Sequence, residues 1–259
     1  MDASLGRAAA SHYDGASADD IAVRCGLASV RLFAEVGSTM DVAHELAAEG
    51  ASAGTLVIAE QQHQGRGRGG HGWLSAPGGT IAMSLVERPT DPSAIGVLSL
   101  RLGLRAAHAL ARHAPDLLVK WPNDLMRSGE KVGGILVEAR WHGVTPDWVV
   151  IGFGLNVRER PWPGSAALDF DGSRVEILEA LVPAFRAAAA ASGGLTEAER
   201  SDWRRRDWAG GRSVVMPARG VVRGVDEDGS LIVDGPAGPI RCTSGSLVLA
   251  EESGDVTRL

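Results

Sequence analysis

Several residue types are scarce in this chain, and each shortage narrows what the protein can be. The two cysteines, Cys25 and Cys242, lie far apart and form no metal-binding or redox motif. This cysteine usage suits a reducing compartment, so we expect a cytoplasmic protein. No apolar run approaches the roughly 18 residues needed to cross a bilayer, and the N-terminal residues do not have the pattern of a signal peptide. A formal net charge of −6 argues against a protein whose main role is to grip nucleic acid.

Lysine, asparagine and glutamine are also rare. Of the 26 basic side chains 24 are arginine, and only Lys120 and Lys131 are lysine. This bias is typical of GC-rich coding, which removes these residue types wherever the protein tolerates the loss. The survivors are therefore candidates for positions that need their side chains. Together with Asn123, Asn156, Gln61, Gln62 and Gln64, the two lysines form three short clusters between residues 61 and 156.

The rest of the composition is that of a folded protein. With 259 residues, 44% hydrophobic and 22% charged, the chain has room for one large domain, or for a large one and a small one. At most a short helix is expected before residue 30, starting near Ser17–Asp20. Apolar periodicity then predicts helices at 37–49, 93–113, 174–191 and 196–208, and strands at 55–60, 80–87, 117–120, 132–141 and 148–157, with a hairpin tip at Ser128-Gly129. Mixed strands and helices with hairpin-like connections favour an α+β fold with a mixed sheet and flanking helices.

The pattern of residue types in the sequence changes after Gly210-Gly211. Five short β-rich runs alternate with Asp-Gly and Pro-Gly turns, which suggests a small barrel that depends on its neighbour for stability. We therefore divide the chain into an N-terminal extension (1–30), a main domain (31–209) and a small C-terminal β domain (210–259).

The first cluster of retained residues lies in a glycine-rich segment, 61–73. Glycines interleave with Arg66 and Arg68, so backbone N–H groups and guanidinium groups could close over an anion. A solvated Arg-Gly loop is an equally plain reading, because the segment lacks the GxxxxGK[ST] pattern of a P-loop. His63 and His71 receive no catalytic role, since loop histidines are usually just solvated.

The second cluster comprises two segments. The first, Lys120-Trp-Pro-Asn-Asp-Leu125, ends a strand in a polar turn. The second, Lys131-Val-Gly-Gly-Ile-Leu-Val-Glu138, starts a strand whose glycines would let a ligand lie on bare backbone. The third cluster is Ile151-Gly-Phe-Gly-Leu-Asn-Val157. The alternative is that these segments bind no ligand. The second cluster is then a hairpin with a solvated lysine, and the third is a tightly packed strand.

With Gly-Ser-Thr at 37–39, these motifs resemble, in order and spacing, those of the bacterial biotin protein ligases. The similarity runs from about residue 30 to 160, and the C-terminal segment resembles the family's SH3-like domain. The resemblance implies a class II synthetase-like catalytic domain at 31–209 that binds biotin and ATP. It also implies a two-step reaction, in which biotin is activated to biotinyl-5′-AMP and then transferred to a lysine of a biotin carboxyl carrier protein.

The resemblance also assigns roles to residues. Ser38, Thr39 and Gln62 would hydrogen-bond the ureido head of biotin, and Gly133 and Gly134 would let its rings pack on backbone. Arg66, Gly67 and Arg68 would close on the biotin tail and the phosphate, while Lys131 would stabilise the junction of carboxylate and phosphate. The nucleotide and its Mg²⁺ would contact Trp73, Asn123, Asp124 and Asn156. Because Mg²⁺ would arrive with the phosphates, we expect no metal site made by protein alone.

The sequence departs from the family pattern in two places, and rival functions are left open. Many members have asparagine where this chain has Met40, and the loop carries fewer arginines than in many relatives. Only about 30 residues precede the catalytic body, so we expect the form without a DNA-binding domain, and no DNA or membrane partner. A lipoate or octanoate ligase and a non-catalytic biotin sensor are the rival functions. The oligomeric state, monomer or weak homodimer, is left open.

Overall fold

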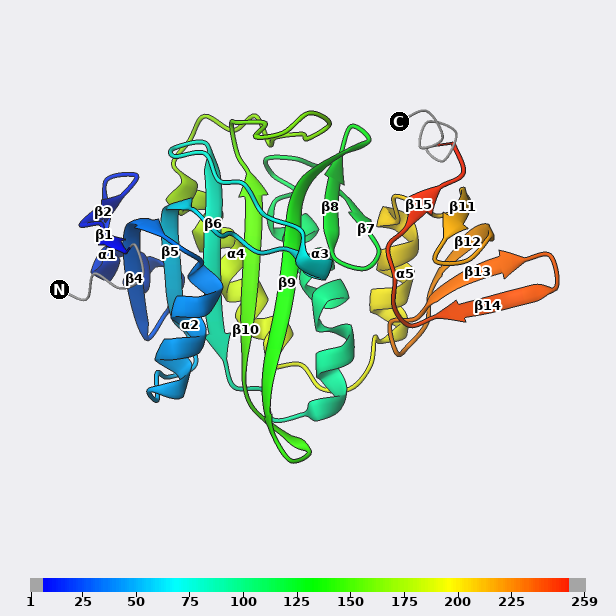
Figure 1. Ribbon diagram of the computed structural model, residues 1–259, viewed down its shortest axis with the longest axis horizontal. Coiled ribbons are helices and arrows are strands. Elements are labelled where there is room, and N and C mark those ends of the chain that lie inside the picture. Colours follow the sequence, from blue (N-terminus) through cyan, green and yellow to red (C-terminus); the bar gives the residue numbers. More distant parts are fainter. Residues whose placement is uncertain (1–6, 252–259) are drawn as a thin grey trace.

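A computed structural model describes residues 7–251. Its centre is an eight-stranded sheet in the order β1-β4-β5-β6-β10-β9-β8-β7 (Figure 1). Its strands are β1 (Ala8–Ala9), β4 (Ser29–Val36), β5 (Thr55–Gln62), β6 (Thr80–Glu87), β7 (Leu118–Lys120), β8 (Asp124–Arg127), β9 (Glu130–His142) and β10 (Thr145–Asn156). Strands β4 and β5 run parallel and the other neighbours antiparallel. The predicted mixed sheet of an α+β fold is confirmed.

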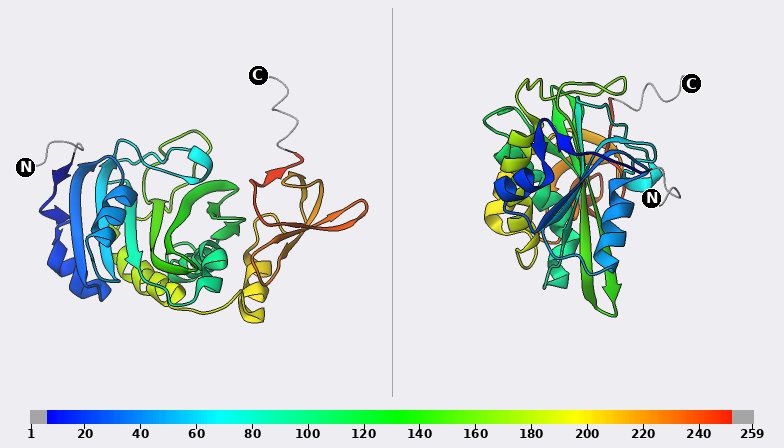
Figure 2. Two further views of the ribbon diagram at one scale, coloured as in Figure 1. Left: turned by 60° about the horizontal axis from the view of Figure 1, so that its bottom comes forward. Right: turned by 90° about the vertical axis from the view of Figure 1, so that its left-hand side faces the viewer.

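Helices cover both faces of this sheet. Helix α2 (Thr39–Ala48) lies on one face, and α1 (Ala18–Cys25), α3 (Leu98–Ala109) and α4 (Arg174–Ala189) lie on the other (Figure 2). Strand β5 is apolar from Leu56 to Ala59 because it is covered on both faces. Val57 and Ala59 pack with the α2 cluster, whereas Leu56 and Ile58 pack into the larger core. A strand buried on both faces has no polar alternation.

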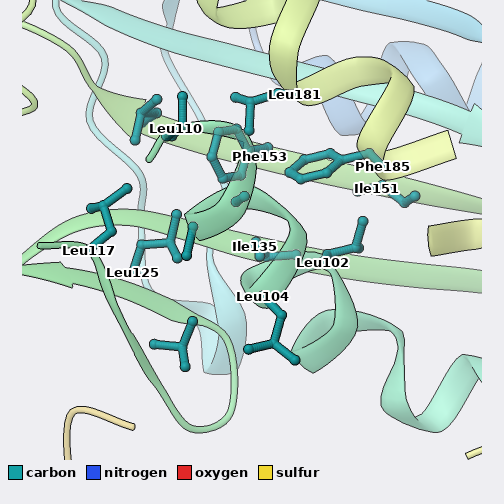
Figure 3. Close-up of a cluster of buried hydrophobic side chains, with 14 of the residues drawn as sticks. Leu102, Leu104, Leu110, Leu117, Leu125, Ile135, Ile151, Phe153, Leu181 and Phe185 are labelled. Carbon is teal, nitrogen blue, oxygen red and sulfur yellow. The ribbon is translucent and has the colours of Figure 1, made fainter. Parts of the chain in front are cut away.

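The larger core lies between the sheet and the helices α1, α3 and α4. Phe153 of β10 meets Phe185 of α4 edge to face, with ring centroids 5.1 Å apart (Figure 3). Leucines of α3 and Ile135 of β9 extend the cluster toward β8. The core thus covers the face of β9 and β10 that is turned toward α3 and α4, and their opposite face is left for a binding site.

The N-terminal residues are attached to this sheet. Strand β1 pairs with β4, and a small hairpin of β2 (His12–Tyr13) and β3 (Ala16–Ser17) precedes α1. Ser17 caps α1 in a capping box with Asp20, at the predicted start. The guanidinium of Arg174 donates to Glu60 at 2.8 Å, and its backbone N–H donates to Asp14 at 2.7 Å. The domain boundary at residue 30 stays a prediction.

Some predicted elements differ from those observed. The long helix expected at 93–113 is a 3₁₀ segment, η3 (Pro92–Val97), followed by the shorter α3. Gly96 is a poor helix former in that first part. Strands β4 and β8 were not predicted. The hairpin tip at Ser128-Gly129 is confirmed, and both residues have positive φ. Within residues 7–251, no helix is long and apolar enough to cross a membrane.

The C-terminal residues form a second, smaller sheet. After helix α5 (Glu197–Arg206), five antiparallel strands follow in the order β14-β13-β12-β11-β15. They are β11 (Ser213–Met216), β12 (Gly220–Val225), β13 (Leu231–Gly235), β14 (Gly238–Cys242) and β15 (Val248–Leu249). The indole N–H of Trp121 donates to the Gly229 carbonyl at 3.0 Å, which ties this sheet to the β7–β8 turn.

Candidate active site

A small cavity lies against strands β9 and β10, on the side away from the α3–α4 core. Nine of the residues that the sequence singled out line it together: Thr39, Gln62, Arg66, Gly67, Arg68, Trp73, Asn123, Lys131 and Gly134. Apolar residues complete the lining: Met40, Met83, Ile135, Leu136 and Phe153, with Gly152 and Gly154. An apolar slot with a few aimed polar groups is the usual form of a small-molecule site.

One end of the cavity is a fixed chain of hydrogen bonds. The buried Ser84 hydroxyl donates to the Thr39 hydroxyl at 2.8 Å. Thr39 in turn donates through its hydroxyl (3.0 Å) and its backbone N–H (2.9 Å) to the side-chain carbonyl of Gln62. Because the Gln62 carbonyl already accepts both hydrogen bonds from Thr39, the orientation of its amide group is fixed. The N–H groups of that amide are therefore the donors at this end of the cavity.

Ser38 and Gly133 do not line this cavity. Ser38 faces a neighbouring cavity beside α2, and its buried hydroxyl has no hydrogen-bond partner. A Cβ on Gly133 would lie 3.0 Å from the Gly154 carbonyl and 3.2 Å from Leu155, in the interior. Alternation along β9 therefore puts Gly134, and not Gly133, on the site.

Bare backbone on β9 and β10 accommodates two large side chains. Gly154 pairs directly with Gly134 across the strands, and the Trp73 indole covers both. A Cβ on Gly154 would come within 2.2 Å of that ring, and one on Gly152 within 2.5 Å of the Met40 sulfur. Trp162, which the sequence reading missed, packs edge-on against Trp73 with centroids 5.2 Å apart.

Lys131 stands where the cavity opens. Its ammonium pairs with Asp124 at 2.7 Å and lies 5.8 Å from the centroid of Trp73. Asn123 donates to the Ile135 carbonyl at 2.7 Å, which fixes the turn before Asp124. The lysine and the carboxylate therefore come from neighbouring strands, β9 and β8, and hold one another at the rim.

Arg66 is held by carboxylates outside the cavity. Its guanidinium is 2.8 Å from Asp41 and 3.5 Å from Glu138. Glu138 also meets Nε2 of His44 at 3.0 Å, while Nδ1 of that ring accepts from Trp148. Burial lowers the pKa of His44, against the opposing effect of Glu138, so the ring is neutral at pH 7 and donates through Nε2.

A wider groove adjoins the cavity and shares Gly67, Arg68, Trp73, Asn123 and Lys131 with it. Asp124, Lys120 and His71 line the groove and not the cavity, and residues 245–247, between β14 and β15, form its far side. Arg68 bridges the two sides by donating to the Gly245 carbonyl at 2.6 Å. The Gly245–Leu247 wall could not be read from the sequence.

Asn156 lies in the interior. It is fully buried, and its amide group donates to the Ala166 carbonyl at 2.9 Å. Its carbonyl oxygen has no partner in the protein. This position fits a residue that anchors the segment after β10, and it lines neither the cavity nor the groove.

Comparison with known proteins supports the site. The profile of the biotin/lipoate A/B protein ligase family matches residues 32–156. A biotin–acetyl-CoA-carboxylase ligase of Paracoccus denitrificans is 33% identical over 229 residues, covering 80% of this chain and 95% of that protein. The bifunctional ligase/repressor BirA of Bacillus subtilis is 38% identical over 131 residues, covering 49% of this chain. This match spans only 39% of that relative's length.

A solved structure agrees with these sequence matches. The biotin protein ligase from Aquifex aeolicus in complex with biotin and ATP superimposes with a TM-score of 0.67 and 25% identity, covering 85% of this chain and 97% of that one. The profile match contains the whole lining of the smaller cavity, from Thr39 to Gly154. The chain belongs to the biotin/lipoate A/B protein ligase family.

Proposed function

We propose that this protein is an ATP-dependent biotin–protein ligase. The observation that carries the proposal is the position of Lys131, which lines both the slot of the smaller cavity and the open groove. In this account biotin occupies the slot and ATP the groove, so their reacting groups meet beside this ammonium. The relatives and the solved neighbour named above as biotin ligases support the same assignment.

In the first step a carboxylate oxygen of biotin attacks the α-phosphorus of ATP. The new bond joins that oxygen to phosphorus, and the bond from phosphorus to the bridging oxygen breaks. Pyrophosphate leaves with the bonding electron pair. Negative charge grows on the phosphoryl oxygens, and preorganised cations beside them lower the barrier. Lys131 and Arg68 stabilise this charge.

In the second step a lysine amine of the carrier attacks the carbonyl carbon of biotinyl-5′-AMP. An amide bond forms, the bond from carbon to the phosphate oxygen breaks, and AMP leaves with the electron pair. The amine loses a proton to solvent. Until the carrier arrives, the mixed anhydride must be kept from water. Trp73 and Trp162 exclude water from this part of the site.

Biotin fits the slot better than lipoate does. The Ser84–Thr39–Gln62 chain holds an oriented amide at the end of an apolar slot, which matches the polar ureido ring. A linear acyl chain would pair with none of the Gln62 amide N–H groups, which are the donors that this chain of hydrogen bonds leaves available. The wall at Met40 adds apolar contact where many members of the family carry asparagine.

ATP is taken as its magnesium complex in this proposal. Among residues 7–251 no cluster of three or more His, Cys, Asp or Glu side chains forms a metal cage. One carboxylate in the groove, that of Asp124, fits a Mg²⁺ ion whose other ligands are phosphate oxygens and water. The bound ion would neutralise phosphate charge, and Asp124 would orient it while also facing Lys131.

The acceptor that we propose is a biotin carboxyl carrier protein of a biotin-dependent carboxylase, and the compartment is the cytoplasm. Biotin-dependent exchange of labelled pyrophosphate into ATP tests the first step. We expect exchange with biotin and none with lipoate. The Lys131→Arg variant should lose at least about 100-fold, because a forked guanidinium replaces a compact ammonium poorly. Tight biotin binding without exchange by the wild type would contradict a ligase and indicate a sensor.

A further inference from the structure

The second lysine of the chain has no role in the mechanism above. Only two of the 26 basic residues are lysine, and both line the same groove. Lys131 stands between slot and groove, whereas Lys120 lines the groove alone. A retained lysine at this place is therefore an observation that the proposed function leaves unexplained.

The fold puts Lys120 in register with the reaction centre. It is the last residue of β7 and pairs with Asp124 of β8 across the strands. Asp124 holds Lys131 at 2.7 Å. Asp124 is thus the cross-strand neighbour of Lys120 and the ion-pair partner of Lys131, and of the two lysines only Lys131 also lines the slot. The ammonium of Lys120 lies 4.4 Å from the centroid of the Trp208 ring, which stabilises a cation there.

The charges of the groove match an extended anion. Arg68, Lys120 and Lys131 line it, and Asp124 partly neutralises Lys131. A triphosphate whose α-phosphorus lies beside Lys131 extends its other two phosphates into the groove, away from the slot. Charge accumulates on exactly those phosphates when the bond to the α-phosphorus breaks. A cation at the groove end would stabilise the leaving group.

We propose that Lys120 binds the β- and γ-phosphates of ATP and the departing pyrophosphate. This role rests on the proposed function and extends it to the leaving group. The ammonium keeps its proton throughout: it donates hydrogen bonds to phosphate oxygens, and the bonding electrons remain with pyrophosphate. Since AMP and the carrier lysine do not occupy that end of the groove, Lys120 takes part in adenylate formation and not in transfer to the carrier.

The chain offers a matched control for this role. Arg212 contacts the same indole, with its guanidinium carbon 4.6 Å from the Trp208 ring centroid. It is not part of the groove lining. If Lys120 acted only by packing on Trp208, loss of Arg212 would have a comparable effect.

The test measures the two half-reactions separately on the full chain. For Lys120→Met we expect biotin-dependent pyrophosphate exchange to fall about 10- to 100-fold, with a raised KM for pyrophosphate. Transfer from supplied biotinyl-5′-AMP to the carrier should stay within about twofold of wild type, because that step releases no pyrophosphate. Arg212→Met should leave both half-reactions near wild type, and Lys120→Arg should recover part of the exchange.

Other outcomes overturn the role. Unchanged exchange in Lys120→Met, with an active wild type, would refute it and leave the ligase assignment intact. Equal losses in exchange and transfer, in Lys120→Met and Lys120→Gln alike, would show that the lysine supports the fold. A wild type without biotin-dependent exchange would overturn the proposed function itself, and this role with it.

Discussion

The Lys131 ammonium lines both the slot and the groove, and its surroundings explain why lysine stands there. Lys131 must face a carboxylate, a tryptophan ring and, in our proposal, the reacting phosphate. A compact cation can exchange these partners with small movements, whereas a planar guanidinium needs its fork aligned. Arg66 instead rests on Asp41 and Glu138, exposed ion pairs worth at most about 1 kcal/mol. It is therefore free to turn toward a ligand at little cost.

Gly154 gives a second test at the scale of one residue. A Cβ there would lie 2.2 Å from the Trp73 ring, so the Gly154→Ala variant must displace the indole from its place over Gly134. We expect a red shift of tryptophan emission and a loss of biotin-dependent exchange of about 100-fold, since small misplacements in a site cost that much.

Gly103 in α3 provides the matched control. Its added Cβ would meet Val119 at 3.5 Å, an ordinary contact, and alanine is the better helix former. Gly103→Ala should keep wild-type emission and exchange. If Gly154→Ala also kept both, Trp73 would not be packed on the glycine pair as described.

At the scale of elements, patterned segments could be predicted from the sequence. The start of α1 and the apolar runs of β5 and β6 are local signals, and the structure confirms them. Strand β8 was missed because its four residues are too few to show a period. Strand β4 does carry an apolar residue at every second position from Val30 to Val36, and this signal was overlooked. The start of α3 was predicted too early because the apolar spacing was given more weight than Gly96, a poor helix former.

The motifs that form the site could be predicted from the sequence, but the side of each strand on which their residues lie could not. The motifs brought nine residues to one cavity, yet Gly133 and Asn156 turn inward and Ser38 faces another cavity. The side of a strand on which a residue lies depends on register, and register is fixed by pairing far along the chain. Trp162 and the Gly245–Leu247 wall belong to segments without a motif.

At the scale of the whole molecule, the junction of the two sheets carries a titratable group. Asp207 follows α5 and lies beside β7, where its backbone forms a bridge with Val119. One carboxylate oxygen accepts from the Ala209 N–H at 3.0 Å, and the other is buried without a partner. Burial raises the pKa of Asp207 to about 6, although the backbone N–H groups of Ala209 and Gly210 and the nearby Trp203 indole oppose the shift.

This shift predicts how stability depends on pH. A carboxyl with a raised pKa in the folded state is favoured there when protonated, so its contribution is present below pH 4 and is lost as pH rises through about 6. Asp207→Asn should remove that loss. We expect the variant to be more stable than wild type by about 1–2 kcal/mol at pH 8 and nearly equal to it at pH 4.

Urea unfolding at several pH values measures this difference. The wild-type and variant curves should converge toward acid pH and separate between pH 4 and pH 7. A constant difference across this range, or a variant less stable at pH 8, would mean that Asp207 is charged and well solvated in the folded protein.

The position of the Lys131 ammonium in a complex shows whether this group acts on the reacting atoms. A crystal structure with a non-hydrolysable analogue of biotinyl-5′-AMP would give that position. We predict that Nζ lies about 3 Å from oxygens at the junction of acyl group and phosphate, with the ureido ring at Gln62. An ammonium that stays on Asp124 and points away from this junction, or an analogue bound outside the slot and groove, would contradict it.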